Sequence, residues 1–375
     1  MRTRPLPAAS ISYKAYRRES FFASLDGLRC LSICAVIWHH TGIALPGVNI
    51  AKHGYLGVDL FFAISGFLIT TLLLRERDKR GSISLKDFYM RRTLRIFPLY
   101  YAVIALYAVV VWAVERDTPA GRQFFANLPY FLTYTTNWFV QLDGRVIFYF
   151  AWSLATEEQF YLVWPTVEKL LRGWRPVWLV VVLLIARELV AMSVASGDVP
   201  PDNLSVVVIL SIYPPLLGGV VLAHVLHDPR AFVAVRPILG ARWAAVVILA
   251  ALAAGIELGF PRAIVWTLMA LLVGAVVVRE SNGLAPVLTW RPFARIGMVS
   301  YGMYLLHMLS YNAVKKALTA AALDYPWLFF PLTVTLAALV ATISYRYYEA
   351  PFLRLKDRFT RVPTRQTVNA LGSPT

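Results

Sequence analysis

Two polar residues share one face of the first long apolar segment. Arg29 and His40 are eleven residues apart, which is roughly 20° beyond three full helical turns and about 16 Å along a helix axis. An imidazole can accept a proton from a hydroxyl group or carry an acyl group, and a guanidinium can hold an anion or stabilise developing negative charge. Such residues inside a membrane helix indicate a functional site. In the alternative interpretation, Arg29 reaches the interface and His40 only ends the span.

Two further pairs of charged residues could join them. Arg92 and Arg95 are three residues apart and share a helix face. They suit a phosphate-bearing ligand through bidentate hydrogen bonds, or else they contact lipid headgroups and determine topology. Glu157 and Glu158 are adjacent and therefore do not face each other on a helix. One of them could line a cavity while the other forms a structural ion pair with an arginine.

Other polar residues lie within the apolar segments. Asp59 is near the outer end of the second segment and is either a supporting site residue or an interfacial one. Ser300 and His307 are seven residues apart and share a helix face, although His307 could equally be a histidine satisfied inside the bundle. Ser65 and Gly66 form a small pair of the kind that allows close packing of helices.

Composition places the chain in the membrane. It has 375 residues, of which 58% are hydrophobic, against about 45–50% in soluble domains. The net charge of +16 does not indicate a nucleic-acid partner, because the basic residues lie in short loops between apolar runs. The two cysteines, Cys30 and Cys34, are four residues apart and are expected to be buried small side chains. We predict neither a disulfide nor a metal site from them.

The apolar runs predict an all-α, polytopic helical bundle of about ten transmembrane helices. Segment 128–140 is too short and polar to cross alone, and we expect it at the outer interface. The predicted spans are 25–44, 56–74, 96–114, 146–165, 177–195, 205–225, 243–259, 262–278, 299–315 and 327–345.

Loop charges orient this bundle with both termini in the cytoplasm. With that orientation, 28 of the 37 Lys and Arg residues lie on the cytoplasmic side. The organisation is then a basic cytoplasmic tail at 1–24, a membrane domain at 25–347 and a second basic cytoplasmic tail at 348–375, with Pro351 ending the last helix. The tail before the first span has no apolar region, so that span is expected to be retained. The basic residues expected outside are Lys52, Arg116, Arg122, Arg145, Arg262, Lys315 and Lys316.

Other classes of protein fit less well. No nucleotide-binding loop, zinc-protease motif or hydrolase nucleophile motif is present. A transporter or flippase for a lipid-linked sugar also uses intramembrane charges and broken helices, and Tyr213 to Gly219 could be such a break. No matching interruption occurs in a second half of the chain. A structural membrane subunit would leave the aligned Arg29 and His40 unexplained.

Six segments in this order resemble membrane-bound acyltransferase family 3, the acyl-CoA-dependent O-acyltransferases of surface glycans and small molecules. Each motif alone is weak, but together they extend over almost the whole chain. They are 25–29 with the gap to His40, 57–69, 92–98, 152–161, 300–307 and 347–351.

The resemblance implies a multi-pass enzyme of the bacterial cytoplasmic membrane. Its donor would be cytoplasmic acetyl-CoA or another acyl-CoA, bound as a substrate, with no permanently bound cofactor or metal. Its acceptor would be a hydroxyl group on the outer side, most commonly of exopolysaccharide or lipopolysaccharide, with a macrolide or lipo-oligosaccharide as alternatives. Its other partners would be membrane lipids and glycan-assembly proteins, and no nucleic acid.

The resemblance also assigns roles to residues. His40 and Arg29 match the essential His and Arg of the family, Arg92 and Arg95 its Arg-x-x-Arg pair, and Glu157 and Glu158 its acidic motif. We expect Arg92 and Arg95 to hold the CoA phosphates. Some members carry an additional extracytoplasmic hydrolase-like domain. This sequence runs about 30 residues past its last span, so we expect a second transfer step to need another protein. Supporting residues are expected at Asp59, Ser300, Tyr304 and His307.

Overall fold

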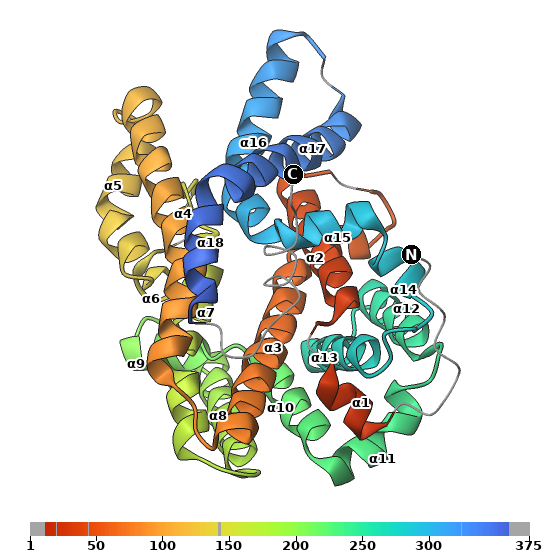
Figure 1. Ribbon diagram of the computed structural model, residues 1–375. Helices are drawn as coiled ribbons and strands as arrows, with labels where there is room; N and C mark the ends of the chain where they lie inside the picture. Colours follow the sequence, from red (N-terminus) through yellow and green to blue (C-terminus); the bar gives the residue numbers. More distant parts are fainter. Residues whose placement is uncertain (1–11, 20, 44, 142–143, 324, 360–375) are drawn as a thin grey trace.

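The chain is helical throughout its described part. The computed structural model describes residues 12–19, 21–43, 45–141, 144–323 and 325–359, and within these ranges all regular structure is helix (Figure 1). This confirms the predicted all-α class. The elements are α1 (Tyr13–Arg18), α2 (Ala23–Thr41), η1 (Ile50–His53), α3 (Leu56–Arg80), α4 (Leu85–Val114), α5 (Pro119–Leu132), α6 (Thr136–Phe139), α7 (Ala151–Leu170), α8 (Arg175–Ala195), α9 (Leu204–Leu210), α10 (Pro214–His227), α11 (Pro229–Leu239), α12 (Ala244–Glu257), α13 (Arg262–Val278), α14 (Ala285–Leu288), α15 (Arg291–Met298), α16 (Ser300–Ala320), α17 (Pro326–Ser344), η2 (Tyr345–Glu349) and α18 (Ala350–Asp357).

Each of the ten predicted spans coincides with a helix or with a bent helix pair. By length and composition, four described helices could cross a membrane, or six if each bent pair counts as one span. The pairs are α9 with α10, bent by 46°, and α11 with α12, bent by 75°. Helices α2, α7 and α16, which contain charged and other polar residues, fall outside that count. The structure thus supports a multi-pass membrane protein, while the number ten and the orientation stay predictions.

Helix α3 lies in the middle of the bundle, against α2 and α10 (Figure 1). Of its apolar window, 78% is buried, whereas α8 has 6% buried and faces outward. Glycines permit the contact between α3 and α10. A Cβ at Gly66 would lie 2.0 Å from the Leu216 carbonyl oxygen, and one at Gly219 would lie 2.2 Å from that of Ala63. The predicted packing role of Gly66 is therefore confirmed.

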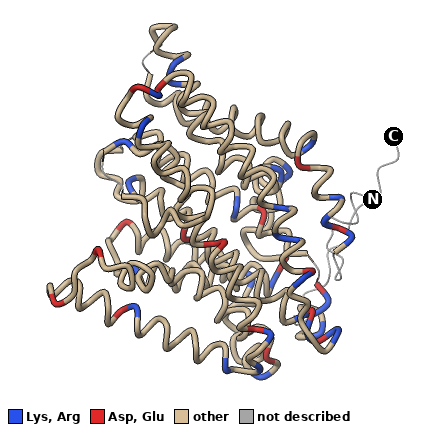
Figure 2. Tube along the Cα trace, turned by 90° about the vertical axis from the view of Figure 1, so that its left-hand side faces the viewer, with Lys and Arg blue, Asp and Glu red and all other residues tan. Residues whose placement is uncertain are grey.

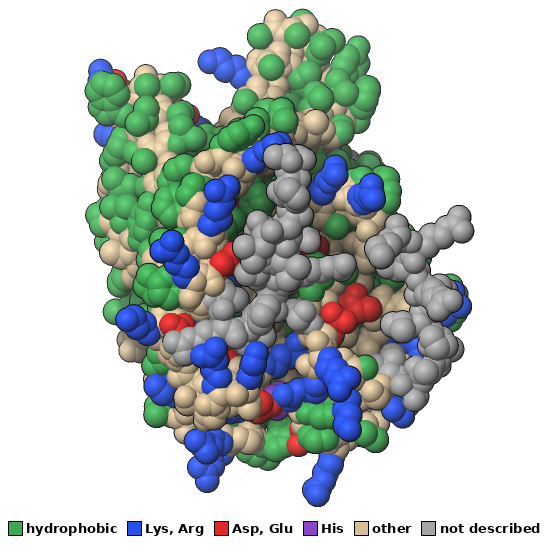
Figure 3. All heavy atoms as spheres, viewed as in Figure 1, with side chains coloured by type: hydrophobic (Ala, Val, Ile, Leu, Met, Phe, Trp, Pro, Cys, Tyr) green, Lys and Arg blue, Asp and Glu red, His purple; other side chains and the backbone are tan. Residues whose placement is uncertain are grey.

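Charge and apolar surface are segregated. Lys and Arg are more frequent toward the right-hand side of Figure 2, although some also lie on the left. In Figure 3 they gather over the lower half of the molecule, while hydrophobic side chains cover α4, α5 and the upper part of α16. Val109 and Trp112 of α4 are 65% and 60% exposed. Exposed apolar area of this extent is expected against lipid and not against water.

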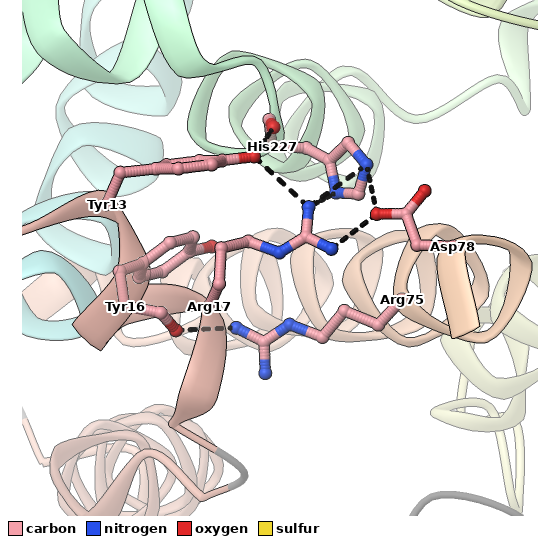
Figure 4. A network of polar contacts seen from close by, with 6 residues as sticks. All are labelled: Tyr13, Tyr16, Arg17, Arg75, Asp78 and His227. Carbon is pink, nitrogen blue, oxygen red and sulfur yellow. Dashed lines mark hydrogen bonds and ion pairs between the residues drawn. The ribbon is translucent and has the colours of Figure 1, made fainter.

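Part of the predicted N-terminal tail is a docked helix. In Figure 4, Arg17 of α1 reaches Asp78 of α3 and the imidazole of His227 at the end of α10. His227 Nε2 in turn lies 3.2 Å from an Asp78 carboxylate oxygen. On the same helix, the Tyr16 carbonyl accepts a hydrogen bond from Arg75 at 3.1 Å. The tail at 1–24 thus contributes a packed element to the basic face.

The chain also continues as a helix past Pro351, where the sequence predicts an end. A single π-helical stretch, η2, is followed directly by α18, which packs along α4. Pro351 lies in the first turn of α18, where a missing N–H is tolerated because it has no intrahelical partner. The Tyr348 hydroxyl donates to the Pro98 carbonyl at 3.1 Å and ties the two segments together. The prediction that Pro351 ends the helix is wrong, and residues 350–357 are packed.

Segment 128–140, predicted to lie at the outer interface, folds as the end of α5 and the short α6. The Trp138 indole donates to Ser211 Oγ at 3.0 Å, and Asn137 donates to Gln159 at 3.0 Å. The segment is therefore fastened to α7 and to the residues after α9. Its position relative to the membrane stays a prediction.

Candidate active site

A cavity of about 140 Å³ collects most of the charged candidates. Its walls come from α2, α3, α4, α7 and α16, which are far apart in sequence. It thus brings together seven of the residues that the sequence singled out, from four separate segments. These are Arg29, Arg92, Arg95, Glu157, Glu158, Ser300 and Tyr304.

One part of the cavity wall is strongly basic. Arg29 Nη1 lies 2.8 Å from an Asp26 carboxylate oxygen on the preceding turn of α2. The Arg92 guanidinium lies over the Tyr161 ring, 5.0 Å from its centroid. Within the part of the chain that the structure describes, neither Arg92 nor Arg95 has an ion-pair partner within 4.0 Å. Two guanidinium groups without a close ion pair make this wall suited to an anionic ligand.

The predicted division of the acidic pair, with one carboxylate in the cavity and the other in an ion pair with an arginine, is wrong. Both carboxylates line the cavity, and Glu157 accepts a hydrogen bond from the Tyr161 hydroxyl. That hydroxyl lies 2.5 Å from Ser65 Oγ. Since the Tyr161 proton points to Glu157, Ser65 donates to the Tyr161 oxygen. Glu158 has no arginine nitrogen within 4.0 Å among the described residues, so the structural ion pair considered for it is not formed.

Two members of this cluster were missed from the sequence. Ser65 was interpreted as a packing residue, but its hydroxyl points into the cavity and only Gly66 makes the close contact. Tyr161 was part of a matching segment without a role of its own. A signal was available for Tyr161, because it is four residues after Glu157 and so shares its helix face.

His40 pairs with His307 on a different helix. Nδ1 of His40 lies 3.1 Å from Nε2 of His307, and the ring centroids are 4.8 Å apart. Nδ1 of His307 lies 2.5 Å from the Tyr304 carbonyl oxygen. A carbonyl only accepts, which assigns the proton of His307 to Nδ1 and leaves its Nε2 as an acceptor. His40 must then donate from Nδ1, and its Nε2 carries a free lone pair.

Tyr304 joins this histidine pair to the cavity. Its ring lines the cavity, while its hydroxyl lies 2.6 Å from Ser153 Oγ and donates to the Phe150 carbonyl at 3.2 Å. His40 and His307 are not in the described lining. Arg29 and His40 share a face of α2, as predicted. Arg29 lies in the basic wall of the cavity, whereas His40 lies about 16 Å further along the axis of α2.

Asp59 lies apart from both groups. Its side chain is buried, and Oδ2 accepts a hydrogen bond from the Trp266 indole of α13 at 2.7 Å. It does not belong to the described cavity lining. This contact fastens α3 to α13, so the structure places Asp59 among the supporting contacts of the bundle.

A histidine pair, of which His307 is buried and His40 half-buried, beside an arginine-lined cavity in a bundle of apolar helices is an arrangement suited to a membrane-embedded transferase site. Residues 22–346 match the family model for acyltransferase family 3, described as an acyltransferase domain. Because this match covers most of the chain, the protein belongs to acyltransferase family 3. The resemblance inferred from the six motifs is confirmed.

Individual relatives agree with the family. The peptidoglycan O-acetyltransferase OatA of Listeria monocytogenes is 28% identical over 90% of this chain and 56% of its own length. A provisionally named O-acetyltransferase of Staphylococcus aureus strain COL is 29% identical over 91% of this chain and 58% of its own. A provisionally named peptidoglycan O-acetyltransferase of Bacillus subtilis strain 168 is 26% identical over 90% and 56%. The chain thus spans less than two thirds of each relative. No solved structure matches it significantly.

Proposed function

We propose that this protein is an O-acyltransferase of the bacterial cytoplasmic membrane that transfers an acetyl group from cytoplasmic acetyl-CoA to a hydroxyl group of a glycan outside. The observation that carries the proposal is the hydrogen-bonded series from Tyr304 through His307 to His40. It leaves Nε2 of His40 unprotonated. Family membership favours this chemistry over transport.

The basic cavity wall would hold the donor. Arg92 and Arg95 would bind CoA phosphates through charge-assisted hydrogen bonds, and Arg29 would complete the anion site from α2. Both arginines lie in the first half of α4, just after the basic turn that is predicted to be cytoplasmic. A donor entering from that side would present its thioester toward Tyr304 and the histidine pair.

His40 Nε2 can serve transfer in two ways. In direct transfer it accepts the proton of the acceptor hydroxyl while that oxygen forms a bond to the thioester carbonyl carbon. The C–S bond then breaks, and the departing CoA sulfur takes the proton from His40. In covalent transfer Nε2 itself first forms the bond to the carbonyl carbon, and the C–S bond breaks so that CoA departs as a thiolate. The acceptor oxygen then bonds to the same carbon, the bond to Nε2 breaks, and the hydroxyl proton passes to the CoA thiolate. In both, His307 holds His40 in the required tautomer.

The acidic residues would complete the site. Glu157 fixes the Tyr161 hydroxyl, so its role is to hold the wall against which Arg92 stacks. Glu158 is free to accept a hydrogen bond from a substrate hydroxyl or amide. Ser300 and Tyr304 would line the path of the acyl group on the α16 side.

The acceptor is proposed from the relatives. Two of them have names that give peptidoglycan as their substrate, which makes peptidoglycan the first acceptor to test. Exopolysaccharide and lipopolysaccharide come second, and a macrolide or lipo-oligosaccharide third. Glycan-assembly proteins would supply the acceptor at the outer face.

The test uses full-length protein in lipid nanodiscs with acetyl-CoA. Acceptor-dependent release of the free CoA thiol, with acetylated glycan seen by mass spectrometry, is the expected result. His40→Ala should abolish both, whereas His39→Ala, on a different face of α2, should retain both. If no glycan acceptor stimulates CoA release, the proposal is overturned and transport is favoured. Full activity of His40→Ala would also overturn the proposed role of His40.

A further inference from the structure

A second cavity, of about 350 Å³, is lined in part by Tyr149, whose ring contacts His40. It is formed by the C-terminal part of α4, the segment that leads into α7, and the middle of α16. Side chains of both aromatic and polar type line it. The argument uses Tyr107, Arg145, Phe148, Tyr149, Met308 and Asn312.

Two helices, α4 and α16, contribute lining residues to both cavities. On α4, Arg95 belongs to the first cavity and Tyr107, twelve residues later, belongs to the second. On α16, Tyr304 belongs to the first and Met308 to the second, with His307 between them in sequence. The two cavities therefore lie at successive levels of the bundle: about 18 Å of rise separates Arg95 from Tyr107 on α4, and about 6 Å separates Tyr304 from Met308 on α16.

Aromatic rings connect the second cavity directly to the histidine pair. The Tyr149 ring, which lines the cavity, packs edge-on against the His40 ring with 5.6 Å between centroids. Its neighbour Phe150 packs against His307 at 5.0 Å. A ligand in the second cavity is thus one ring away from His40.

The lining of the second cavity suits a neutral polyhydroxyl ligand. The Tyr107 side chain is only 3% exposed, and its hydroxyl has no hydrogen-bond partner among the described residues. A buried hydroxyl of this kind usually has a partner, which a ligand can supply. Arg145 is already neutralised by Glu115 through contacts of 2.7 and 3.0 Å. Asn312 and Tyr149 offer further neutral polar groups, and Phe148 and Met308 offer apolar surface.

The cavity is not closed at its far end. A neighbouring open hollow shares Gly144 and Arg145 with it and extends over the first turn of α5. Its other lining residues are Thr118, Pro119, Ala120 and Gln123. An extended ligand can therefore place one unit near Tyr149 while the rest of the chain lies along this hollow.

We propose that the second cavity is the acceptor site and binds one saccharide unit of a glycan chain, with the Tyr107 hydroxyl as a hydrogen-bond partner. This rests on the proposed acyl transfer and adds where the acceptor binds. The saccharide enters from the side opposite to the donor, and its hydroxyl reaches His40 past the Tyr149 ring. Donor and acceptor then occupy chemically distinct cavities, one cationic and one neutral.

Kinetics of single variants test the site. Tyr107→Phe removes only the unpartnered hydroxyl and Asn312→Ala removes an amide. With a soluble peptidoglycan tetrasaccharide as acceptor, each should raise the acceptor KM about tenfold, the effect of one lost hydrogen bond to a buried group. The KM for acetyl-CoA should not change. Tyr101→Phe is the matched control, because its hydroxyl bonds to the Leu132 carbonyl outside the cavity. Unchanged acceptor KM in both test variants overturns the assignment.

A labelling measurement separates this inference from the proposed function. Asn312→Cys in nanodiscs is treated with a polar maleimide with and without the tetrasaccharide, and Lys315→Cys of the same helix is the control outside the cavity. Protection of Cys at 312 alone supports saccharide binding here even if no acetylation occurs, in which case only the proposed chemistry fails. Acetylation without protection at 312 overturns the site and leaves the chemistry standing. If the protein gives no acetylation and the saccharide gives no protection at position 312, both the site and the proposed chemistry are overturned.

Discussion

Nδ1 of His40 and Nε2 of His307 lie 3.1 Å apart, although 267 positions separate the two residues in sequence. The contact makes one imidazole the orienting group of the other, because the Tyr304 carbonyl has already determined which nitrogen of His307 carries the proton. In the proposed mechanism, His40 is thus oriented as a base by a second imidazole, and no carboxylate of the described residues is hydrogen-bonded to it. Tyr304 lines the cationic cavity, and Tyr149, whose ring contacts His40, lines the neutral one.

Removing the orienting imidazole should impair turnover and leave binding unchanged. In His307→Ala, His40 loses the acceptor that keeps its proton on Nδ1, so kcat for acetylation should fall by about 10²-fold, within the range of a general base. His307→Gln can still offer an acceptor oxygen and should recover part of that loss. Steady-state kinetics with both substrates measure the effect. Equal kcat in His307→Ala and wild type would contradict the positioning role.

The arginine wall makes a prediction about the donor. Arg95→Ala should raise the KM for acetyl-CoA about 10- to 100-fold, since a charge-assisted hydrogen bond contributes about 1.5–3 kcal/mol. With acetyl-pantetheine, which has no phosphate groups, wild type and variant should be alike. Arg91→Ala is the control, because Arg91 pairs with Glu76 at 3.1 Å outside the cavity. A loss of equal size with both donors would show that Arg95 does not bind phosphate.

The contact between α3 and α10 can be tested with two adjacent glycines. A Cβ at Gly219 would lie 2.2 Å from the Ala63 carbonyl oxygen, whereas one at Gly218 would meet its nearest atom, Ala270 Cβ, at 3.7 Å. Gly219→Ala should therefore destabilise the fold by about 1–3 kcal/mol or more through overpacking. Gly218→Ala should be neutral or stabilising by up to about 1 kcal/mol. Thermal unfolding in one detergent compares them, and equal Tm values would argue against this packing.

The carboxyl group of Glu280, just beyond α13, makes stability depend on pH. Its pKa is raised to about 7, mainly by burial and next by the nearby Glu19, although backbone hydrogen bonds from Ser24 and Ala23 oppose the shift. The folded protein therefore favours the protonated form. Its stabilising contribution is complete below about pH 4.5 and is lost as the pH rises through about 7.

Thermal unfolding at pH 5.5 and 8 should show this as a lower Tm at the higher pH. Glu280→Gln keeps the shape of the neutral acid and should reduce the difference between the two pH values, with its main gain in Tm at pH 8. An unchanged pH profile in Glu280→Gln would assign the dependence to other groups.

Local sequence periodicity was sufficient to predict most of the helices of this protein and the faces that several site residues occupy. Apolar runs marked the helices because a chain in lipid must satisfy its backbone hydrogen bonds within each segment. Helical spacing predicted that Arg29 and His40 share one face, and the small Gly66 indicated a close helix contact. These features depend on neighbours within a few residues, so they can be read from the order of the residues. The six motifs supplied the family in the same way.

Only the tertiary structure decided which faces meet. It gave His40 its partner on α16, turned Ser65 toward Tyr161, and paired Asp59 with Trp266, contacts that span from 96 to 267 positions. It also carried the last helix past Pro351, because the packing of α18 on α4 decides whether a proline stops a helix or starts one. Periodicity determines the face that a residue occupies, while the packing of whole helices determines what lies opposite that face.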